Sequence, residues 1–281
     1  MESPAETTPP VPSDAAPPDI VPSPKHPGVW SGLGTVALYF LLQFGLSILV
    51  GALIAVALGV AGGFHAATGH HKFDPHAVTR LIQQNPDIRV ILTVLTIAAA
   101  AAVMTALVRR TWPAQWSRGE LPGFGFVQPD SKLAYPGAVL LGVAVLLAGA
   151  ALTNLFAGSN PVQQDVALMA DKVSPDMRIL LALLVVCVAP FVEELVFRGV
   201  LLSGLASRMR SGWAIVASAL IFGCAHLPDF KFAWYPVPAL VLLGLALAWL
   251  RLKTRSIWPS ITLHATNNFV AAMTWFMVAG H

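Results

Sequence analysis

Long apolar runs separated by short polar stretches make up most of the chain. A helix that spans a membrane needs about 20 mostly apolar residues. Seven runs reach or approach this length, at residues 33–60, 88–108, 134–156, 178–203, 212–228, 234–251 and 257–278. The pattern predicts an all-α fold, a polytopic membrane bundle of about seven transmembrane helices. The run at 212–228 is the weakest of the seven, because it is short and ends at a proline.

The composition supports this interpretation. Hydrophobic residues make up 56% of the 281 residues and charged residues only 11%, whereas soluble domains have about 25% charged residues. The formal net charge of +3 is small and does not indicate a nucleic-acid partner. We therefore expect the lipid bilayer to surround most of the chain.

The first 29 residues differ from the rest. They contain nine prolines, several Ser, Thr and Ala residues, and few large apolar side chains. Such a segment buries too little surface to offset its ordering entropy, so we predict a disordered Pro-rich tail at 1–29. We expect N-terminal transmembrane helices and loops at 30–177. A core whose helices carry polar residues follows at 178–278.

Lys and Arg are distributed unevenly between the predicted loops. They are more frequent on the side of the N-terminus, where Arg109, Arg110 and Arg251 lie, than on the opposite side. Because positive loops stay in the cytoplasm, we predict a cytoplasmic N-terminus in a multi-pass protein of the cell (inner) membrane.

Three of the last four runs contain residues that are costly in hydrocarbon. A charged side chain at the centre of a span costs about 2.5–3.5 kcal/mol on insertion scales, so such residues are functional candidates. Here they are Glu193, Glu194 and Arg198 in 178–203, His226 in 212–228, and His264, Asn267 and Asn268 in 257–278.

Helical spacing separates the two adjacent carboxylates. Glu194 and Arg198 are four residues apart, so they share one helix face and can pair. Glu193 is rotated about 100° away and is expected to lie against apolar surroundings. A desolvated carboxylate suits general-base catalysis. We therefore predict that Glu193 is the base and that Glu194 and Arg198 support it.

The other candidates also fall on shared helix faces. Phe222 and His226 are four residues apart, as are His264 and Asn268. The three helices can bring these groups into one cavity within the membrane. Each group also has a structural interpretation, since intramembrane ion pairs, histidines and asparagines commonly join neighbouring helices. It is their combination that favours a catalytic site.

At these residues the sequence resembles the CAAX-protease and bacteriocin-processing family of intramembrane proteases, also called the CPBP or Abi family. Its three signatures are EE-x-x-x-R, F-x-x-x-H and H-x-x-x-N. Here they are "EELVFR", "FGCAH" and "HATNN", in the same order. The resemblance covers residues 178 to 278, while the preceding part is similar only in consisting of hydrophobic helices.

The resemblance implies an intramembrane endopeptidase that acts on a membrane-associated peptide or protein, either prenylated or bearing a leader. Glu193 would activate a water molecule with the help of His226. His264 and Asn268 would stabilise the oxyanion, and Glu194 with Arg198 would hold the base in place.

The resemblance leaves the use of a metal open. Glu193, His226 and His264 have the donor types of a two-His, one-carboxylate Zn²⁺ site. The same residues suit a metal-free glutamate mechanism.

Two other functions compete with proteolysis. A transporter or ion or proton relay would use the same buried Glu, Arg and His groups, but it predicts polar residues along a path across the membrane. Segments 33–60 and 88–108 offer little beyond Gln43. A non-catalytic immunity protein is the second alternative, and the complete signature set disfavours it.

Overall fold

The computed structural model describes residues 25–69, 75–158 and 163–278, and no strand occurs in these residues. The α-helices are α1 (Val29–Thr68), α2 (Pro75–Gln84), α3 (Pro86–Thr111), α4 (Ala134–Ala157), α5 (Asp165–Ala170), α6 (Pro175–Leu183), α7 (Ala189–Glu194), α8 (Leu202–Ala206), α9 (Ser211–Ala225), α10 (Val237–Thr254) and α11 (Trp258–Val278). Short 3-10 helices η1 (Pro113–Gln115) and η4 (Leu227–Phe230) and π-helical segments η2 (Leu184–Val188) and η3 (Leu195–Leu201) complete the set.

The predicted helical bundle is confirmed, and each of the seven predicted runs corresponds to a helix. The run at 178–203 becomes one continuous 32-residue helix, Pro175–Ala206, made of α6, η2, α7, η3 and α8. The short helices α2 and α5 were not predicted. The predicted tail at 1–29 lies almost entirely outside the described residues, so it stays a prediction, as does the division at 177.

Five helices in the described residues are long and apolar enough to cross a membrane: α1, α3, α4, the helix 175–206 and α10. The other two predicted spans do not qualify by these measures. Helix α9 is shorter than a full span. Helix α11 has 21 residues, but its His264, Asn267 and Asn268 lower its hydropathy. The two exceptions are thus a short helix and a helix that contributes polar groups to the site.

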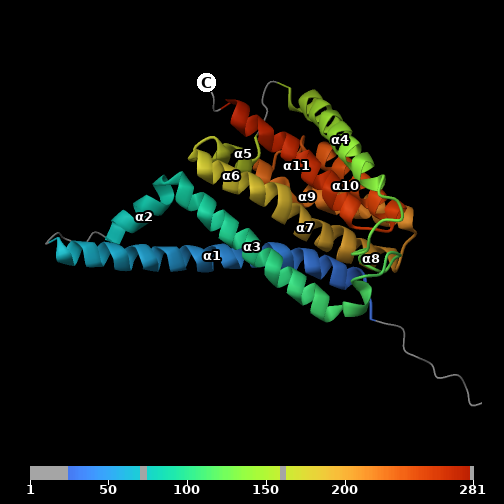
Figure 1. The fold of residues 1–281 in the computed structure, drawn as a ribbon, viewed down its shortest axis with the longest axis horizontal. Coiled ribbons are helices and arrows are strands. Elements are labelled where there is room, and N and C mark those ends of the chain that lie inside the picture. The colour runs from blue at the N-terminus through green and yellow to red at the C-terminus, as the bar shows by residue number, and fades with distance from the viewer. Residues whose placement is uncertain (1–24, 70–74, 159–162, 279–281) are drawn as a thin grey trace, which may run out of the picture.

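Helix α1 is much longer than its partners. It has 40 residues, or about 60 Å, twice the hydrocarbon thickness of a membrane. Its buried residues, Gly32, Thr35, Val36 and Tyr39, all lie in its first third. Figure 1 shows that the remaining part extends past the bundle and meets α2. Only the beginning of α1 therefore contributes to the core.

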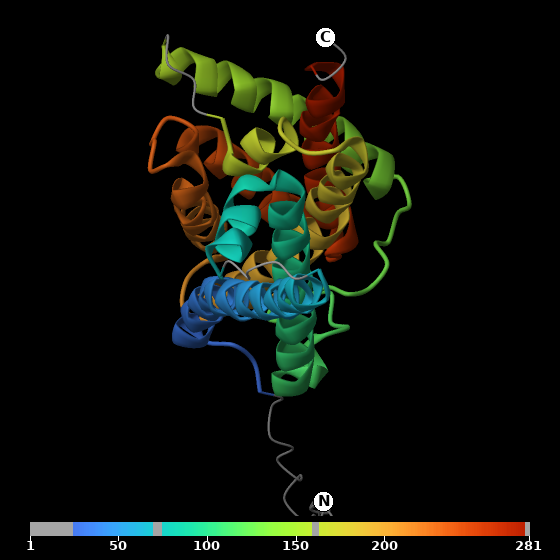
Figure 2. The same ribbon diagram turned by 90° about the vertical axis from the view of Figure 1, so that its left-hand side faces the viewer.

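The helices that carry the site form a layered bundle. Helix α10 packs against α4, α9 and α11, while α1 packs against α3, η3 and α8. Helices α1 and α4 lie on opposite sides of the bundle (Figures 1 and 2). Small residues allow close crossings: a Cβ on Gly142 of α4 would lie 2.8 Å from the Leu263 carbonyl oxygen, and one on Gly244 of α10 would lie 2.9 Å from Ala219 Cα.

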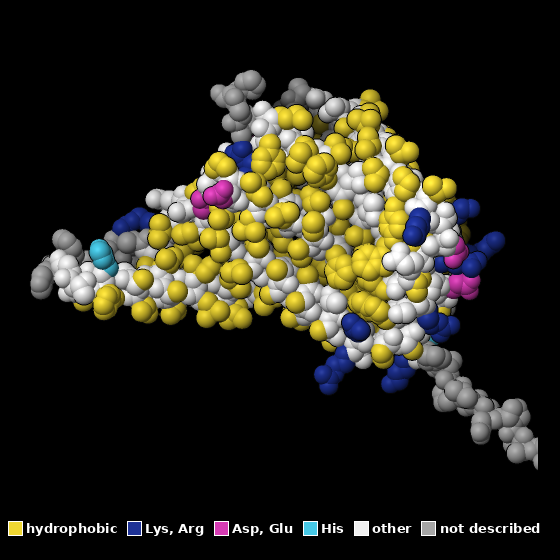
Figure 3. Space-filling view, viewed as in Figure 1, with side chains coloured by type: hydrophobic (Ala, Val, Ile, Leu, Met, Phe, Trp, Pro, Cys, Tyr) yellow, Lys and Arg dark blue, Asp and Glu magenta, His cyan; other side chains and the backbone are white. Residues whose placement is uncertain are grey.

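The surface fits a lipid environment. Large hydrophobic side chains such as Leu41, Phe44 and Ile48 are exposed along α1. Figure 3 shows hydrophobic side chains across most of one face, with Lys and Arg gathered mainly toward the end of the bundle where α8 lies. A broad apolar surface bounded by basic residues is the pattern expected of a membrane protein.

Candidate active site

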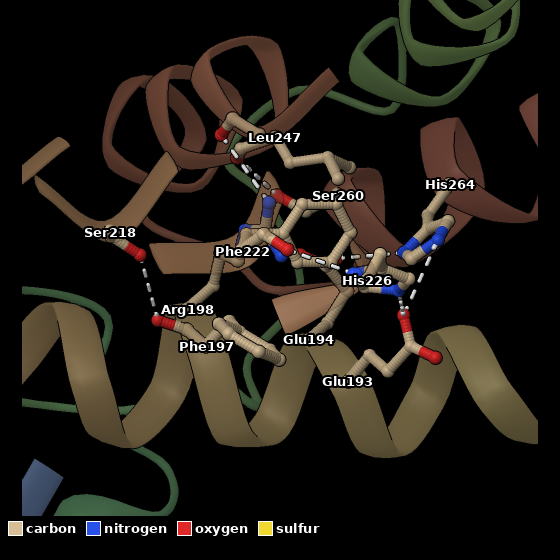
Figure 4. A network of polar contacts seen from close by, with 11 residues as sticks. Glu193, Glu194, Phe197, Arg198, Ser218, Phe222, His226, Leu247, Ser260 and His264 are labelled. Carbon is tan, nitrogen blue, oxygen red and sulfur yellow. Dashed lines mark hydrogen bonds and ion pairs between the residues drawn. The ribbon is translucent and has the colours of Figure 1, made fainter. Parts of the chain in front are cut away.

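The signature residues of three helices meet around one carboxylate (Figure 4). Glu193, at the end of α7, has its Oε2 atom 3.7 Å from the Nε2 atom of His226 and 3.7 Å from the Nε2 atom of His264. The Glu193 side chain keeps 15% of its surface exposed. Residues 193, 226 and 264 are thus brought together as the sequence predicted.

Glu194 forms the predicted pair with Arg198. Glu194 Oε1 lies 3.2 Å from Arg198 Nη1, and both side chains are fully buried. Arg198 Nη2 also donates a 3.4 Å hydrogen bond to the carbonyl oxygen of Gly244. The guanidinium lies 4.3 Å from the ring centroid of Phe222, a distance at which the cation is attracted by the ring. The buried charge is therefore neutralised and held by three neighbours.

His264 joins the two carboxylates. Its Nδ1 atom lies 2.9 Å from Glu194 Oε1, and its Nε2 atom faces Glu193. Because an ionised carboxylate only accepts hydrogen bonds, Nδ1 carries the hydrogen and donates it to Glu194. The helical spacing of Glu194 and Arg198 gave no indication of this contact across 70 residues of chain.

The end of α9 determines the position of His226. This residue is the C-cap of α9, directly after Ala225. Its Nδ1 atom lies 2.8 Å from the Phe222 carbonyl oxygen, which is an acceptor only, so Nδ1 donates. The ring centroids of Phe222 and His226 are 4.6 Å apart. In the neutral ring, Nε2 is consequently the acceptor, and it faces Glu193.

Two hydrogen bonds hold the side chain of Asn268. Its Nδ2 atom donates a 2.8 Å hydrogen bond to the carbonyl oxygen of Val185 in η2. Asn267 Nδ2 donates to Asn268 Oδ1 at 3.3 Å. The wider π-helical turn of η2 lies beside the functional groups, as π-segments frequently do. One N–H of the Asn268 carboxamide thus remains available for a ligand.

The expected surroundings of Glu193 were wrong. The sequence placed this carboxylate against apolar neighbours, but two imidazoles face it. Helical spacing identified only the neighbours of Glu193 on its own helix, whereas the residues that touch it come from the end of α9 and from α11.

A cavity of about 660 Å³ opens onto the site and contains Glu193, His226, His264 and Asn268 in its wall. This volume lies within the usual range of ligand pockets. Sequence analysis missed several polar residues that also line it: Tyr39 of α1, Asn154 of α4, Asp165 of α5 and Asp229 of η4. Gln43 lines it as well. Its presence in an apolar run was visible in the sequence, but the run alone did not show that it faces a cavity.

Asp229 of η4 lies in the wall of this cavity. Burial raises the pKa of its carboxyl above the usual Asp value. The opposing effect of His226 lowers that pKa, and Glu193 and Asp165 raise it further. The part of the cavity wall formed by η4 therefore holds a carboxylate whose charged form is disfavoured in the fold.

The donor types at the site suit zinc. Imidazole and carboxylate ligands are typical of catalytic Zn²⁺ sites. Both imidazoles also donate their Nδ1 hydrogen to an oxygen acceptor, the Phe222 carbonyl or Glu194, as metal-binding histidines usually do. In the part of the chain that the structure describes, however, no group of three or more His, Cys, Asp or Glu side chains is assembled as a metal-ligand cluster. The chemistry of the donors fits the ion, while their spacing is wider than that of bound ligands.

Comparison with known proteins identifies the same region. Residues 175–270 match the family model described as Rce1-like, type II CAAX prenyl endopeptidase. This range begins at α6 and includes all the signature residues. No curated protein and no solved structure matches the chain significantly. The resemblance to CAAX proteases is thus confirmed over residues 175–270.

Proposed function

Residues 175–270 are Rce1-like, and on this basis we propose that the protein is an intramembrane endopeptidase with Glu193 as its general base. The substrate would be a membrane-associated peptide or protein, prenylated or bearing a leader. The observation that carries the proposal is the convergence of His226 and His264 on the Glu193 carboxylate at the wall of a large cavity.

In the proposed reaction, a water molecule beside Glu193 attacks the scissile carbonyl carbon. The Glu193 carboxylate takes one proton from that water and later gives it to the leaving amine nitrogen. The C–N bond breaks, the hydroxyl stays on the acyl carbon, and Glu193 returns to its charged form. General-base catalysis of this kind contributes about 10²–10⁴-fold to a rate.

His226 and His264 would have different tasks. The His226 Nε2 atom accepts hydrogen bonds in the neutral ring, so it can orient the attacking water together with Glu193. His264 would donate from Nε2 to the oxyanion in its imidazolium form, in which both ring nitrogens carry protons. The free N–H of Asn268 would be the second donor.

Glu194 and Arg198 would act through His264 and the helix. Glu194 accepts the Nδ1 hydrogen of His264 and so fixes the orientation of that ring. Arg198 neutralises Glu194, which keeps the pair tolerable in the core.

Glu193, His226 and His264 would hold a zinc ion if the enzyme uses one. Bound zinc would supply a Lewis acid and lower the pKa of a bound water. The roles of Glu194 and the Phe222 carbonyl would then be to orient the ligand rings.

The first test is cleavage of a panel of fluorogenic peptides, including prenylated C-terminal peptides, by the purified protein in detergent. We expect wild-type protein to cleave at least one peptide and Glu193→Gln to lose that activity. Glu120→Gln is the matched control, because Glu120 is exposed and its only ion pair in the described residues, with Arg255, lies outside the cavity. Activity retained in Glu193→Gln would refute the assignment of the base. Loss of activity with a chelator, reversed by Zn²⁺, would distinguish a metalloprotease from a glutamate protease.

A further inference from the structure

Two polar residues of α1, Tyr39 and Gln43, line the cavity that contains Glu193. Tyr39 is only 2% exposed, and Gln43 is half-buried. Within the described residues, neither the Tyr39 hydroxyl nor the Gln43 carboxamide makes a hydrogen bond. Buried polar side chains nearly always have a partner. Tyr39 is such a buried side chain without a partner, and half-buried Gln43 lies beside it in the cavity wall, so a ligand in the cavity could supply partners to both.

The packing of α1 places these residues beside the catalytic base. Helix α1 and the helix 175–206 run in opposite directions (Figure 1). They cross closely at Gly32, where a Cβ would lie 3.2 Å from Leu201 Cα. Tyr39 follows about 10 Å further along α1, and Glu193 lies about 12 Å back from Leu201. Tyr39 is therefore nearly level with Glu193, and Gln43 is one turn beyond it.

We propose that Tyr39 and Gln43 form a track on α1 that hydrogen-bonds the backbone of the substrate peptide in an extended conformation. This inference rests on the proposed function and adds a substrate subsite to it. It assigns a role to the first helix, which lies outside the residues 175–270 that match the family model.

The chemistry of the track matches a peptide backbone. A tyrosine hydroxyl keeps its proton at neutral pH and donates to a carbonyl oxygen, and a carboxamide both donates and accepts. Residues four apart on a helix are separated by about 6 Å along its axis. Every second residue of an extended chain repeats at about 6.8 Å. Two peptide groups on one side of an extended substrate can thus contact Tyr39 and Gln43 together.

The track would bind and position substrate without transferring a proton. Its hydrogen bonds would form equally in the ground state and the transition state. Loss of such an interaction raises KM and leaves kcat unchanged. A structural role of Tyr39 alone would instead lower stability without changing KM in the folded fraction.

The test uses the full-length Glu193→Gln variant in detergent. Under the proposed mechanism this variant binds substrate but cannot cleave it. Fluorescence anisotropy would measure the Kd of the labelled, prenylated peptide that wild-type protein cleaves best. If no peptide is cleaved, the probe is the prenylated C-terminal peptide of the same panel. Adding Tyr39→Phe should weaken binding about three- to tenfold, the usual effect of losing one neutral hydrogen bond. Gln43→Leu should have a similar effect.

Tyr135→Phe is the matched control. It removes the same oxygen from another tyrosine, whose hydroxyl donates to Gln128 at 2.8 Å outside the cavity, and it should leave Kd unchanged. Thermal unfolding of each variant would show that the fold is retained. In the active background, Tyr39→Phe should raise KM by the same factor with kcat within twofold.

The outcomes separate the track from the proposed function. Equal affinity with and without Tyr39→Phe would overturn the track, even if wild-type protein cleaves the peptide. Weaker binding by Tyr39→Phe with no cleavage by wild-type protein would support the track and refute the protease. Absence of binding by Glu193→Gln alone would contradict the substrate class and the track together.

Discussion

Glu193 and Glu194 are neighbours in the chain but belong to two different regions of the site. Glu193 faces the cavity and two imidazole Nε2 atoms. Glu194 is fully buried, pairs with Arg198 and accepts from His264 Nδ1. We call these regions the cavity side and the buried side. A rotation of about 100° along one helix separates a group that can meet substrate from a group that can only hold its neighbours.

His264 is the link between the two regions. One ring nitrogen belongs to the buried side and the other to the cavity side. The buried side therefore influences chemistry at the cavity side through the orientation of this ring, through the charge of Arg198, which acts on Glu193, and through the fold. Single substitutions of the two carboxylates and of Arg198 should accordingly have different signatures. Substitution of Glu193 should reduce activity without reducing stability, whereas substitution of Glu194 or Arg198 should reduce both.

The largest expected effect on activity is that of Glu193→Gln. Removing the base should reduce kcat by about 10²–10⁴-fold, because the amide cannot accept the proton from water. The side chain keeps its size, so the thermal midpoint in detergent should be unchanged. Peptidase kinetics and thermal unfolding on the same preparation would check both. A large loss of stability would mean that Glu193 belongs to the buried side.

Arg198→Met should have the largest effect on stability. It leaves the Glu194 carboxylate buried without a counter-ion, which typically costs about 3–5 kcal/mol. Unfolding by heat or denaturant in detergent would measure the loss. Arg255→Met is the control, since the pair of Arg255 with Glu120 is largely exposed and such pairs contribute little. Equal stability of the two variants would contradict the division into sides.

A double variant sharpens this result. Glu194→Leu with Arg198→Met replaces the buried pair by apolar groups, and such replacements often restore stability. Activity should not return with the stability, because Glu194→Leu removes the acceptor of His264 Nδ1. Recovery of both properties would show that Glu194 does not orient His264.

Glu194→Gln should have an intermediate effect on activity. The amide oxygen can still accept from His264 Nδ1, but it no longer carries the charge that pairs with Arg198. Loss of an outer partner of a functional histidine typically costs about 10–100-fold, so kcat should fall less than in Glu193→Gln. The ratio of the kcat values of Glu193→Gln and Glu194→Gln measures how much more the reaction depends on Glu193 than on Glu194. A greater loss of kcat in Glu194→Gln would reverse the assigned roles.

The smallest effect is expected at Asp229, on the cavity side. Burial raises its pKa in the folded state, so the fold favours the protonated form. The stability from that preference is present below the ordinary Asp pKa of about 3.9 and is lost as the pH rises through the folded value. Asp229→Asn should therefore raise the thermal midpoint slightly at pH 7, and the difference should shrink toward pH 4. A constant difference across this range would contradict the raised pKa.

The sequence by itself determined the helices and the chemical groups of the site. Length and hydropathy alone give 134–156 and 257–278 nearly to the residue, because a membrane span must satisfy its own backbone hydrogen bonds. Spacing within one helix predicted the pair of Glu194 and Arg198, since residues four apart must share a face. Both inferences need only local geometry.

Tertiary structure decided the contacts between helices. The bond of His264 to Glu194 and the approach of both imidazoles to Glu193 join segments up to 71 residues apart. Tyr39 reaches the cavity only because Gly32 allows α1 to cross beside Leu201. Periodicity shows which face of a helix is polar, but the register between two helices depends on the side chains that meet at their crossing. That register, which no single segment encodes, determines which polar groups share the cavity.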